Sequence, residues 1–427
     1  MRTPASLLAY RLATRLATPF GRPFLSYRLN KAKEDPLRVD ERLGIPSCSR
    51  PQGPLVWLHG ASVGEALSLA PLLNRLAEKG LNLLATTGTV TSARLLAPRL
   101  PPGALHQFAP LDAPLYVRRF FDAWRPDLGL FVESELWPNM ILGARRAGAP
   151  LALVNARLSE RSFERWRRAP RFIEALLSRF ETCLAQSEAD AERFSALGAP
   201  NVSVCGNLKY DAPAPPFDRE ELAILAGATS GRRIWAAAST HPGEELIAAE
   251  AHRALQRDFP ETLTLIAPRH VDRGEAIRAE LVAQGFACAL RSRGEPLAPS
   301  VEIYVCDTMG ELGLLYRLAG VVFLGKSLAG EGGQNPIEPA KLASAILHGP
   351  HVANFADVYA ALDTAGGAIA VADAAALEAT LAALFRDPAR QRALARAAQG
   401  LVEARSGAAD RIMSALAPLL PASGAGR

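Results

Sequence analysis

The most restrictive feature of this sequence is a regular alternation of short apolar runs with amphipathic helical segments. In the first half the apolar runs lie at residues 55–58, 82–87, 105–109, 128–132, 151–155, 182–186 and 202–205. Continuously apolar runs of this length form strands that are buried on both faces, and helices between them are typical of a parallel sheet. The pattern therefore predicts an α/β fold with a doubly wound parallel sheet.

The same alternation starts again after a proline-rich segment. Residues 211–216 read Asp-Ala-Pro-Ala-Pro-Pro, and such a restricted backbone is typical of a domain boundary. Beyond it, strand-like runs lie at 234–238, 263–267, 302–306, 321–324 and 344–347, and a helical tail begins at residue 374. We expect an N-terminal segment over 1–50, a Rossmann-like domain over 51–210, a linker over 211–217 and a second Rossmann-like domain with the tail over 218–427. The two domains are expected to face a cleft.

Composition narrows the classes of function. The formal net charge is only +5 over 427 residues, which is too weak to indicate a nucleic-acid partner but suits a phosphorylated partner or an anionic membrane surface. The five cysteines form no Cys-x-x-Cys pair, so we expect neither a disulfide framework nor a structural zinc site. Such a scattered set suits a reducing compartment.

The N-terminal segment over residues 6–29 combines apolar and basic side chains. Arg11, Arg15, Arg22 and Arg28 interrupt its apolar runs, which stay below the ~18 residues of a membrane-spanning helix. A cleaved signal peptide is not expected, because no uninterrupted apolar core follows the basic start. A basic amphipathic segment can lie on a membrane surface, or it can be a helix packed on the first domain. The sequence leaves both possibilities open.

Glu65 lies at a corner between the first strand and a helix. Residues 55–65 read Leu-Val-Trp-Leu-His-Gly-Ala-Ser-Val-Gly-Glu, an apolar run followed by a glycine-containing turn and an acid. Ligands of open α/β sheets bind at the carboxyl ends of the strands, which makes Glu65 a candidate general base. The same carboxylate would also complement the dipole of the following helix, and the sequence leaves the two roles open.

The same stretch contains a pattern of another enzyme class. Gly60, Ser62 and Gly64 match the Gly-x-Ser-x-Gly nucleophile elbow of α/β-hydrolases, which also needs a strand, a turn and a helix. That motif takes an oxyanion donor from an earlier strand–helix loop, and the ~50 residues upstream do not read as one. A serine hydrolase using Ser62 therefore stays as the less favoured alternative.

Charged side chains follow other strands of the first half. Glu133 and Glu135 come after one strand, just before Trp137 and a proline that suits a first helical turn. Lys209 follows the last strand, where it could neutralise a phosphate or a carboxylate. The arginine-rich stretch 157–171 is typical of a solvated helix face, although guanidinium groups also suit a phosphorylated acceptor.

In the second half, polar loops follow four successive strands, at 239–245, 267–270, 307–312 and 332–339. Because the carboxyl ends of parallel strands share one edge of a sheet, we expect a nucleotide site there, with helix N-termini offered to an anion. Neither Gly-x-Gly-x-x-Gly nor Gly-x-x-x-x-Gly-Lys-[Ser/Thr] is present, which argues against a Rossmann dehydrogenase and a P-loop NTPase.

Eight short motifs in one order carry a resemblance to a known family. They are His-Gly-Ala-Ser-Val-Gly-Glu from residue 59, Glu-Ser-Glu-Leu-Trp-Pro-Asn from 133, Asn-Ala-Arg-Leu-Ser-Glu-Arg-Ser from 155, Gly-Asn-Leu-Lys-Tyr-Asp from 206, Ser-Thr-His-Pro-Gly-Glu-Glu from 239, Pro-Arg-His from 268, Asp-Thr-Met-Gly-Glu-Leu from 307 and Gly-Gly-Gln-Asn-Pro-Ile-Glu-Pro from 332. With these motifs, residues 55–355 resemble the 3-deoxy-D-manno-octulosonic acid (Kdo) transferases of lipopolysaccharide biosynthesis.

The resemblance implies a GT-B glycosyltransferase fold, with an acceptor-binding domain over 51–210 and a CMP-sugar-binding domain over 218–427. It also implies an inverting transfer of Kdo from CMP-Kdo to the lipid A precursor, lipid IVA. It implies no metal and no other cofactor, since CMP-Kdo is a substrate. Glu65 matches the proton acceptor, and Glu133 and Lys209 match positions that stabilise the transition state. The positions that match CMP contacts are Pro268, Arg269, Met309, Gly310, Glu311, Asn335, Pro336, Ile337 and Glu338.

The resemblance also implies a location at the cytoplasmic face of the inner membrane, held peripherally or by an N-terminal anchor. Many relatives have a longer apolar anchor than residues 6–29 provide. The expected partners are CMP-Kdo, the phosphorylated lipid A precursor and the anionic membrane surface, and no nucleic acid. The alternatives are another sugar-nucleotide transferase of the same fold and a non-catalytic membrane-surface protein, which would not bind a CMP-sugar.

Overall fold

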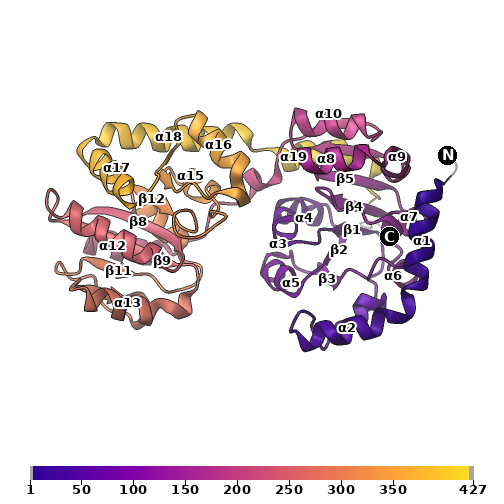
Figure 1. Ribbon diagram of the computed structural model, residues 1–427, viewed down its shortest axis with the longest axis horizontal. Coiled ribbons are helices and arrows are strands. Elements are labelled where there is room, and N and C mark those ends of the chain that lie inside the picture. Colours follow the sequence, from indigo (N-terminus) through magenta and orange to yellow (C-terminus); the bar gives the residue numbers. More distant parts are fainter. Residues whose placement is uncertain (1–2, 423–427) are drawn as a thin grey trace. The chain divides into compact units, whose positions relative to one another are not determined.

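The computed structural model describes residues 3–422; residues 1–2 and 423–427 of the predicted first and last segments lie outside the described part. The chain divides into two compact units, each built on one parallel seven-stranded sheet (Figure 1). Unit 1 contains residues up to Ala212 and the described residues from Ser406 onward, and unit 2 runs from Pro213 to Arg405. The predicted α/β class with two doubly wound parallel sheets is confirmed.

The sheet of unit 1 has the strand order β3-β2-β1-β4-β5-β6-β7. Its strands are β1 (Leu55–His59), β2 (Asn82–Thr87), β3 (Leu105–Phe108), β4 (Leu128–Val132), β5 (Leu151–Ala156), β6 (Thr182–Ala185) and β7 (Val202–Val204). Its helices are α1 (Ala5–Leu16), α2 (Gly21–Asn30), α3 (Val63–Ser68), α4 (Ala70–Glu78), α5 (Val90–Leu96), α6 (Pro114–Trp124), α7 (Pro138–Arg146), α8 (Glu160–Arg167), α9 (Pro170–Leu177), α10 (Glu188–Ala196) and α19 (Ala408–Leu416).

The strand order of unit 1 changes direction between β1 and β4, which lie side by side. At such a switch point the chain leaves neighbouring strands toward opposite faces of the sheet, and a crevice opens at the carboxyl edge. Glu65 follows β1 and Glu133 follows β4. The topology of unit 1 therefore brings two of the predicted catalytic positions to the same crevice.

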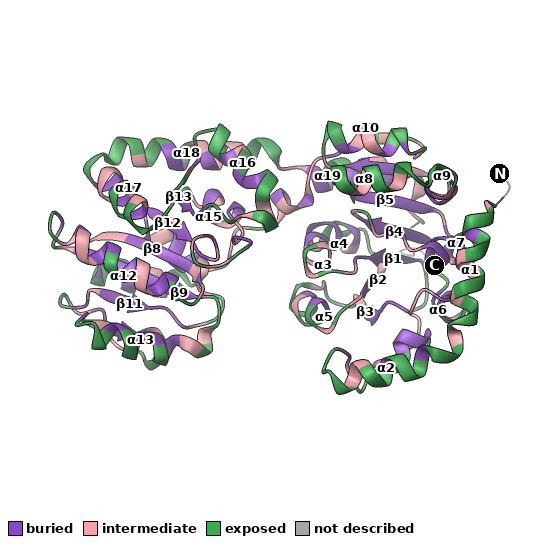
Figure 2. Ribbon diagram, viewed as in Figure 1, coloured by how far each residue is buried: buried purple, intermediate pink, exposed green. Residues whose placement is uncertain are grey.

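Apolar layers cover both faces of this sheet. Leu55 and Trp57 belong to one layer, whereas Val56 and Leu58 belong to the other, because successive side chains of a strand point to opposite faces. In Figure 2 the central strands are accordingly buried. This two-sided burial explains why the strands read as continuous apolar runs in the sequence.

The N-terminal helices pack on unit 1. Leu7 of α1 is fully buried in the same layer as Trp57, and Leu25 of α2 is buried against Tyr116. Tyr10 donates a hydrogen bond from its hydroxyl to the carboxylate of Asp112 at 2.8 Å. These helices are therefore packed on the first domain, while apolar side chains such as Leu8 and Leu12 stay exposed on their outer side.

The sheet of unit 2 has the order β10-β11-β9-β8-β12-β13-β14, with its switch point between β8 and β12. Its strands are β8 (Arg233–Thr240), β9 (Thr262–Pro268), β10 (Cys288–Leu290), β11 (Ile303–Val305), β12 (Val321–Leu324), β13 (Ala345–His348) and β14 (Ala368–Ala370). Its helices are α11 (Arg219–Ala228), α12 (Glu244–Leu255), α13 (Gly274–Ala283), α14 (Leu312–Leu318), α15 (Ile337–Lys341), α16 (Ala356–Thr364), α17 (Ala374–Arg386) and α18 (Pro388–Arg405).

One part of the predicted domain division is wrong. The whole helical tail was expected to belong to the second domain, but only α17 and α18 belong to unit 2, and α19 belongs to unit 1. Ile412 and Leu416 of α19 are fully buried in the layer that contains Val56 and Leu58. The apolar face of α19 completes the core of unit 1, which is why the chain returns to that unit.

Candidate active site

The carboxylate of Glu65 is held at the start of α3. Its Oε2 accepts hydrogen bonds from the N–H groups of Ala61 at 2.8 Å and Ser62 at 3.0 Å. Its Oε1 accepts one from the hydroxyl of Ser62 at 2.6 Å, and the N–H of Glu65 donates back to that hydroxyl at 3.3 Å. These contacts form a capping box, so the helix-capping role that the sequence suggested is present in the structure.

Ser62 is not arranged as a hydrolase nucleophile. Its hydroxyl proton points to Glu65, and the neighbouring His59 is fully buried with its Nδ1 3.0 Å from the Thr86 hydroxyl. Burial, with a smaller contribution from the positive charge of Arg42, lowers the pKa of His59 to about 3. A serine nucleophile needs a base that accepts its proton, and His59 is not in contact with Ser62.

Glu133 and Lys209 lie close together at the same edge of the sheet. Lys209 Nζ lies 3.9 Å from Glu133 Oε1, and both side chains are largely buried. Burial raises the pKa of Glu133, the positive charge of Lys209 lowers it, and the negative charge of Glu65 raises it. The structure therefore brings all three predicted catalytic positions of unit 1 within electrostatic reach of one another.

Two asparagines position the backbone around Lys209. The side-chain oxygen of Asn207 accepts from the N–H of Lys209 at 3.0 Å. The side-chain oxygen of Asn155, at the end of β5, accepts from the N–H of Leu208 at 3.0 Å. These two hydrogen bonds join the end of β5 to the loop that follows β7, and they fix the backbone from which the Lys209 side chain extends.

Four of the eight non-glycine residues with positive φ in the described part of the chain lie at or near these strand ends. Glu133, Asn155, Ser239 and Lys326 have φ values of 54°, 50°, 56° and 58°, and they lie at the ends of β4, β5 and β8 and just after β12. A positive φ in a residue other than glycine costs on the order of 1–3 kcal/mol, and such residues cluster at functional sites. The strain supports a functional role for these edges in both units.

Glu135 is a further acid in this part of unit 1. Its Oε2 accepts a hydrogen bond from the indole N–H of Trp137 at 2.6 Å, and the Trp137 ring packs edge-on to His59 at 5.1 Å. Burial and the negative charge of Glu65 raise the pKa of Glu135 to about 7. No separate role was expected for Glu135 from the sequence, but its raised pKa allows it to bind a proton near neutral pH.

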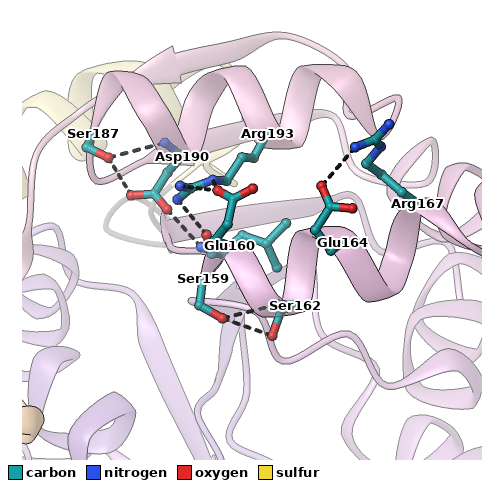
Figure 3. Close-up of polar contacts among 9 residues, drawn as sticks. Ser159, Glu160, Ser162, Glu164, Arg167, Ser187, Asp190 and Arg193 are labelled. Atoms are coloured by element: carbon teal, nitrogen blue, oxygen red, sulfur yellow. Dashed lines mark hydrogen bonds and ion pairs between the residues drawn. The ribbon is translucent and has the colours of Figure 1, made fainter.

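The loop before α8 is organised by polar contacts with α10 (Figure 3). Ser159 caps α8 through the N–H of Ser162, and Glu160 pairs with Arg193 at 2.6 Å. Arg167 pairs with Glu164 on the same helix at 2.8 Å. The link between α8 and α10 is thus made by Glu160 and Arg193, whereas Arg167 of the predicted basic run pairs within α8, as on a solvated helix face.

In unit 2 the buried carboxylate of Glu244 organises the switch point between β8 and β12. It accepts from the N–H of His241 at 2.9 Å, and from the N–H groups of Lys326, Ser327, Leu328 and Ala329 at 2.6–3.4 Å. Residues 239–245 are one of the four polar loops expected to form a nucleotide site. The structure adds that Glu244, the first residue of α12, holds the loop that follows β12 in place.

The predicted CMP positions of unit 2 fall into three groups at the carboxyl edge of its sheet, which follow β9, β12 and β11. Pro268 ends β9, and the N–H of Arg269 donates to the Thr240 carbonyl at 3.0 Å while its side chain is exposed. Asn335 starts the second group: its side chain accepts from the N–H of Ile337 at 3.1 Å and donates to Glu338 at 3.3 Å. Pro336 lies between these contacts, at the N-cap of α15.

The loops after β9 and β12 meet at one side chain. The ring of His241 lies 5.9 Å from that of His270, and its Nε2 lies 3.3 Å from the side-chain nitrogen of Gln334. His241 belongs to the loop after β8, the strand between β9 and β12. His241 therefore links the loop after β9 to the loop after β12, a role that was not predicted from the sequence.

The third stretch, residues 309–311, follows β11. Met309 is 74% exposed, Gly310 has a φ of 87°, and both carboxylate oxygens of Glu311 bind the guanidinium of Arg291. This bidentate contact lowers the pKa of Glu311. The Glu311 side chain thus already has a strong partner within unit 2.

Within residues 3–422, no group of three or more histidine, cysteine, aspartate or glutamate side chains is arranged to hold a metal ion. In the same residues, no helix has the length and apolar character needed to cross a membrane.

Comparisons with known proteins identify the family. The family model of 3-deoxy-D-manno-octulosonic-acid transferase matches residues 37–212. A 3-deoxy-D-manno-octulosonic acid transferase of Bordetella pertussis is 37% identical over 84% of this chain and 86% of its own length. A probable mitochondrial enzyme of the same name from Arabidopsis thaliana is 36% identical over 83% of this chain and 82% of its own length.

Solved structures agree on the fold. A glycosyltransferase from Rickettsia africae covers 88% of this chain with a TM-score of 0.56 at 12% identity. A UDP-GlcNAc 2-epimerase from Neisseria meningitidis covers 86% with a TM-score of 0.58 at 13% identity. At these identities the likeness concerns the fold alone, and it confirms the expected GT-B architecture. The family model and the relatives of 36–37% identity show that the chain belongs to the 3-deoxy-D-manno-octulosonic acid transferase family of glycosyltransferases.

Proposed function

We propose that this chain transfers Kdo from CMP-Kdo to a hydroxyl group of the phosphorylated lipid A precursor, with inversion at the anomeric carbon. Membership of the family supports Kdo as the transferred sugar. The observation that carries the mechanism is the gathering of Glu65, Glu133 and Lys209 at the switch point of unit 1. Glu65 can accept a proton, and Lys209 provides a positive charge beside the second acid, Glu133. Such a set suits a displacement reaction with general-base catalysis.

In the proposed mechanism Glu65 accepts the proton of the acceptor hydroxyl. A carboxylate offers about four lone-pair directions, and three are used by Ala61 and Ser62. The remaining one is available to the incoming hydroxyl. As that oxygen forms its bond to the anomeric carbon of Kdo, the bond from this carbon to the CMP phosphate oxygen breaks, and CMP leaves from the opposite face.

Lys209 and Glu133 are proposed to support the charges of the transition state. Lys209 provides a fixed ammonium group for the negative charge of the Kdo carboxylate or the leaving phosphate. Glu133 holds Lys209 in place through their contact at 3.9 Å. A preorganised charge needs no rearrangement as the reaction proceeds, which is the usual source of such stabilisation.

Unit 2 is proposed to bind the CMP part of the donor. Asn335 and Glu338 at the start of α15 suit the ribose hydroxyl groups, and the exposed Arg269 suits the phosphate. Since the side chain of Glu311 is occupied by Arg291, residues 309–311 would contact the nucleotide through their backbone.

We also propose that unit 1 lies on the cytoplasmic face of the inner membrane through an exposed apolar row on α1 and α2. This N-terminal apolar row consists of Leu8, Leu12, Leu16, Phe20, Phe24 and Tyr27, all of which are exposed. Arginines alternate with it in the sequence, as in amphipathic helices that lie on anionic bilayers. Such a placement would bring the acceptor lipid to unit 1.

The proposed reaction is tested by mass spectrometry of lipid products after incubation with CMP-Kdo and lipid IVA, with and without EDTA. We expect a lipid product heavier by one or more Kdo residues, an equal release of CMP, and no loss of activity in EDTA. Release of free Kdo without a lipid product would favour a hydrolase instead. Use of another sugar nucleotide in preference to CMP-Kdo would favour a different transferase of the same fold.

A further inference from the structure

Residues of helices α1, α6 and α7 of unit 1 line a small cavity. Helix α6 contacts both α1 and α7, and the three helices lie near one another in Figure 1. Its volume is about 110 Å³, and its lining includes Arg11, Arg118 and Arg146 together with Val117, Phe121 and Leu142. One water molecule occupies about 30 Å³ of the liquid, so the cavity has room for a group of the size of a phosphate ester. It combines a cationic rim with an apolar floor.

The positive charges of this cavity are not neutralised by the protein. Among residues 3–422, the guanidinium groups of Arg11, Arg118 and Arg146 take part in no hydrogen bond or ion pair, whereas the neighbouring Arg145 pairs with Glu181. The one acid in the lining is Asp122, which is exposed. Three guanidinium groups against one carboxylate leave an excess of positive charge, and guanidinium groups bind phosphate through paired hydrogen bonds.

The wall formed by α1 is fixed in place by a polar network. Asp112, just before α6, accepts from the Tyr10 hydroxyl at 2.8 Å and from the N–H groups of Asn139 and Met140 at 3.1 and 2.9 Å. The side chain of Asn139 donates to the Thr14 hydroxyl at 3.0 Å. These contacts join α1 to α6 and α7, so the cavity exists before any ligand binds.

The cavity lies next to the N-terminal apolar row. Arg11 is three residues after Leu8 and one before Leu12, whose side chains are 52% and 58% exposed. An amphiphile with its phosphate among the arginines could therefore extend its acyl chains along the exposed leucines. A zwitterionic headgroup would bring its own cation toward three arginines, which favours a headgroup with net negative charge.

We propose that this cavity binds the phosphate of an anionic glycerophospholipid, one molecule per chain, and so sets the orientation of unit 1 on the bilayer. The proposal rests on the proposed membrane association, because the apolar row provides the contact with the lipid tails. It adds a defined site whose main charges, Arg118 and Arg146, lie outside the N-terminal segment.

The test uses the full-length protein and soluble short-chain lipids. Calorimetry should show saturable one-to-one binding of dihexanoyl-phosphatidylglycerol, and at least tenfold weaker binding of dihexanoyl-phosphatidylcholine and of inorganic phosphate. The double variant Arg118→Gln/Arg146→Gln should weaken the phosphatidylglycerol affinity at least tenfold. Arg94→Gln/Arg99→Gln removes the same number of exposed charges from α5 and the turn after it, and should leave the affinity unchanged.

Three outcomes would overturn the proposal: no binding by the unaltered protein, equal losses in both double variants, or inorganic phosphate binding as tightly as phosphatidylglycerol. The last of these would indicate a site for a free anion. Co-sedimentation with phosphatidylglycerol vesicles in high salt tests the proposed membrane association separately from the proposed lipid site in the cavity. If sedimentation depends on the exposed leucines but lipid affinity does not depend on Arg118 and Arg146, only the cavity assignment fails.

Discussion

Glu65 caps α3 and lies at the switch point of unit 1, where it is proposed to accept a proton. Glu65→Gln separates these two roles. Glutamine also serves in a capping box, so the melting temperature should stay close to that of the unaltered protein. Loss of the proton acceptor should lower the rate of Kdo transfer by ~10²–10⁴. The rate is measured as CMP release in the presence of lipid IVA.

Ser62→Ala is the matched control for Glu65→Gln. It removes the hydroxyl that donates to Glu65 at 2.6 Å but leaves both N–H contacts of the carboxylate. We expect a modest loss of stability, ~1 kcal/mol as for other lost N-caps, and a much smaller loss of rate than in Glu65→Gln. Near-normal turnover in Glu65→Gln together with an inactive Ser62→Ala would reverse the assignment of the two residues.

Glu135 should make the stability of unit 1 depend on pH. Its pKa is raised to about 7, so the folded state holds a proton on this group that the unfolded state has already released above about pH 4.5. The free energy of unfolding should therefore fall as pH rises from about 4.5 to 7, by an amount on the order of 2 kcal/mol.

In the Glu135→Gln variant the side chain keeps nearly the same shape, but it has no carboxyl group to bind or release a proton. Urea unfolding at a series of pH values should show a flatter dependence between pH 4.5 and 7 for the variant than for the unaltered protein. Parallel curves for the two proteins would show that Glu135 ionises normally in the folded state.

The sequence predicted which residues lie together at the carboxyl edge of a sheet, but it did not predict which groups these residues bind. Glu65, Glu133 and Lys209 each lie in the segment that follows an apolar run, and parallel strands place such segments on one edge of the sheet. Glu244 was missed, because the N–H groups that it binds belong to residues 326–329, which are distant in the sequence and carry no signal in their side chains.

At the scale of elements, the loop after β12 depends on Glu244. Glu244→Ala leaves buried N–H groups without an acceptor, and breaking such a buried charged contact costs roughly 3–5 kcal/mol. We expect lower thermal stability and a loss of CMP binding, measured by calorimetry. Glu250→Ala on the same helix removes only a surface pair with Arg253 and should change stability by less than ~1 kcal/mol. Equal effects of the two changes would contradict the assignment.

The N-terminal apolar row is a second element with a separable role. Leu8→Ser/Leu12→Ser/Leu16→Ser changes three exposed side chains of α1 and should leave the melting temperature nearly unchanged. Co-sedimentation with anionic vesicles should fall at least tenfold, because apolar contact provides much of the binding of such helices. Ile224→Ser/Val282→Ser alters exposed apolar residues of unit 2 and serves as the control. Undiminished sedimentation of the triple variant would place membrane contact elsewhere.

Most strands were predictable, and the exceptions share a physical cause. The long central strands are buried on both faces and read as apolar runs, whereas β10 and β14 were not predicted. Each of these two strands has three residues and lies at an edge of the sheet of unit 2. A segment this short has no recognisable period, and it forms because a neighbouring strand offers its hydrogen-bonding groups.

At the scale of the whole molecule, the sequence could not show that the chain returns to unit 1 after α18. The segment around α19 reads as one more apolar-periodic helix, and nothing in such a pattern says which sheet will receive it. The structure shows the reason for the return. The carboxylate of Asp211 accepts from the N–H groups of Gly407 and Ala409, and Ile412 fills the core of unit 1.

This arrangement predicts which unit each part of the tail stabilises. Ile412→Ser in α19 should destabilise unit 1, and Leu394→Ser in α18 should destabilise unit 2, each by a few kcal/mol, because both side chains are buried in the core of a different sheet. Hydrogen exchange followed by mass spectrometry reports the two units separately. Ile412→Ser should raise exchange in peptides covering β1 while those covering β8 keep their protection, and Leu394→Ser should do the reverse. If both variants raised exchange only around β8, the tail would belong to unit 2 throughout, as the sequence alone suggested, and the return of the chain to unit 1 would be wrong.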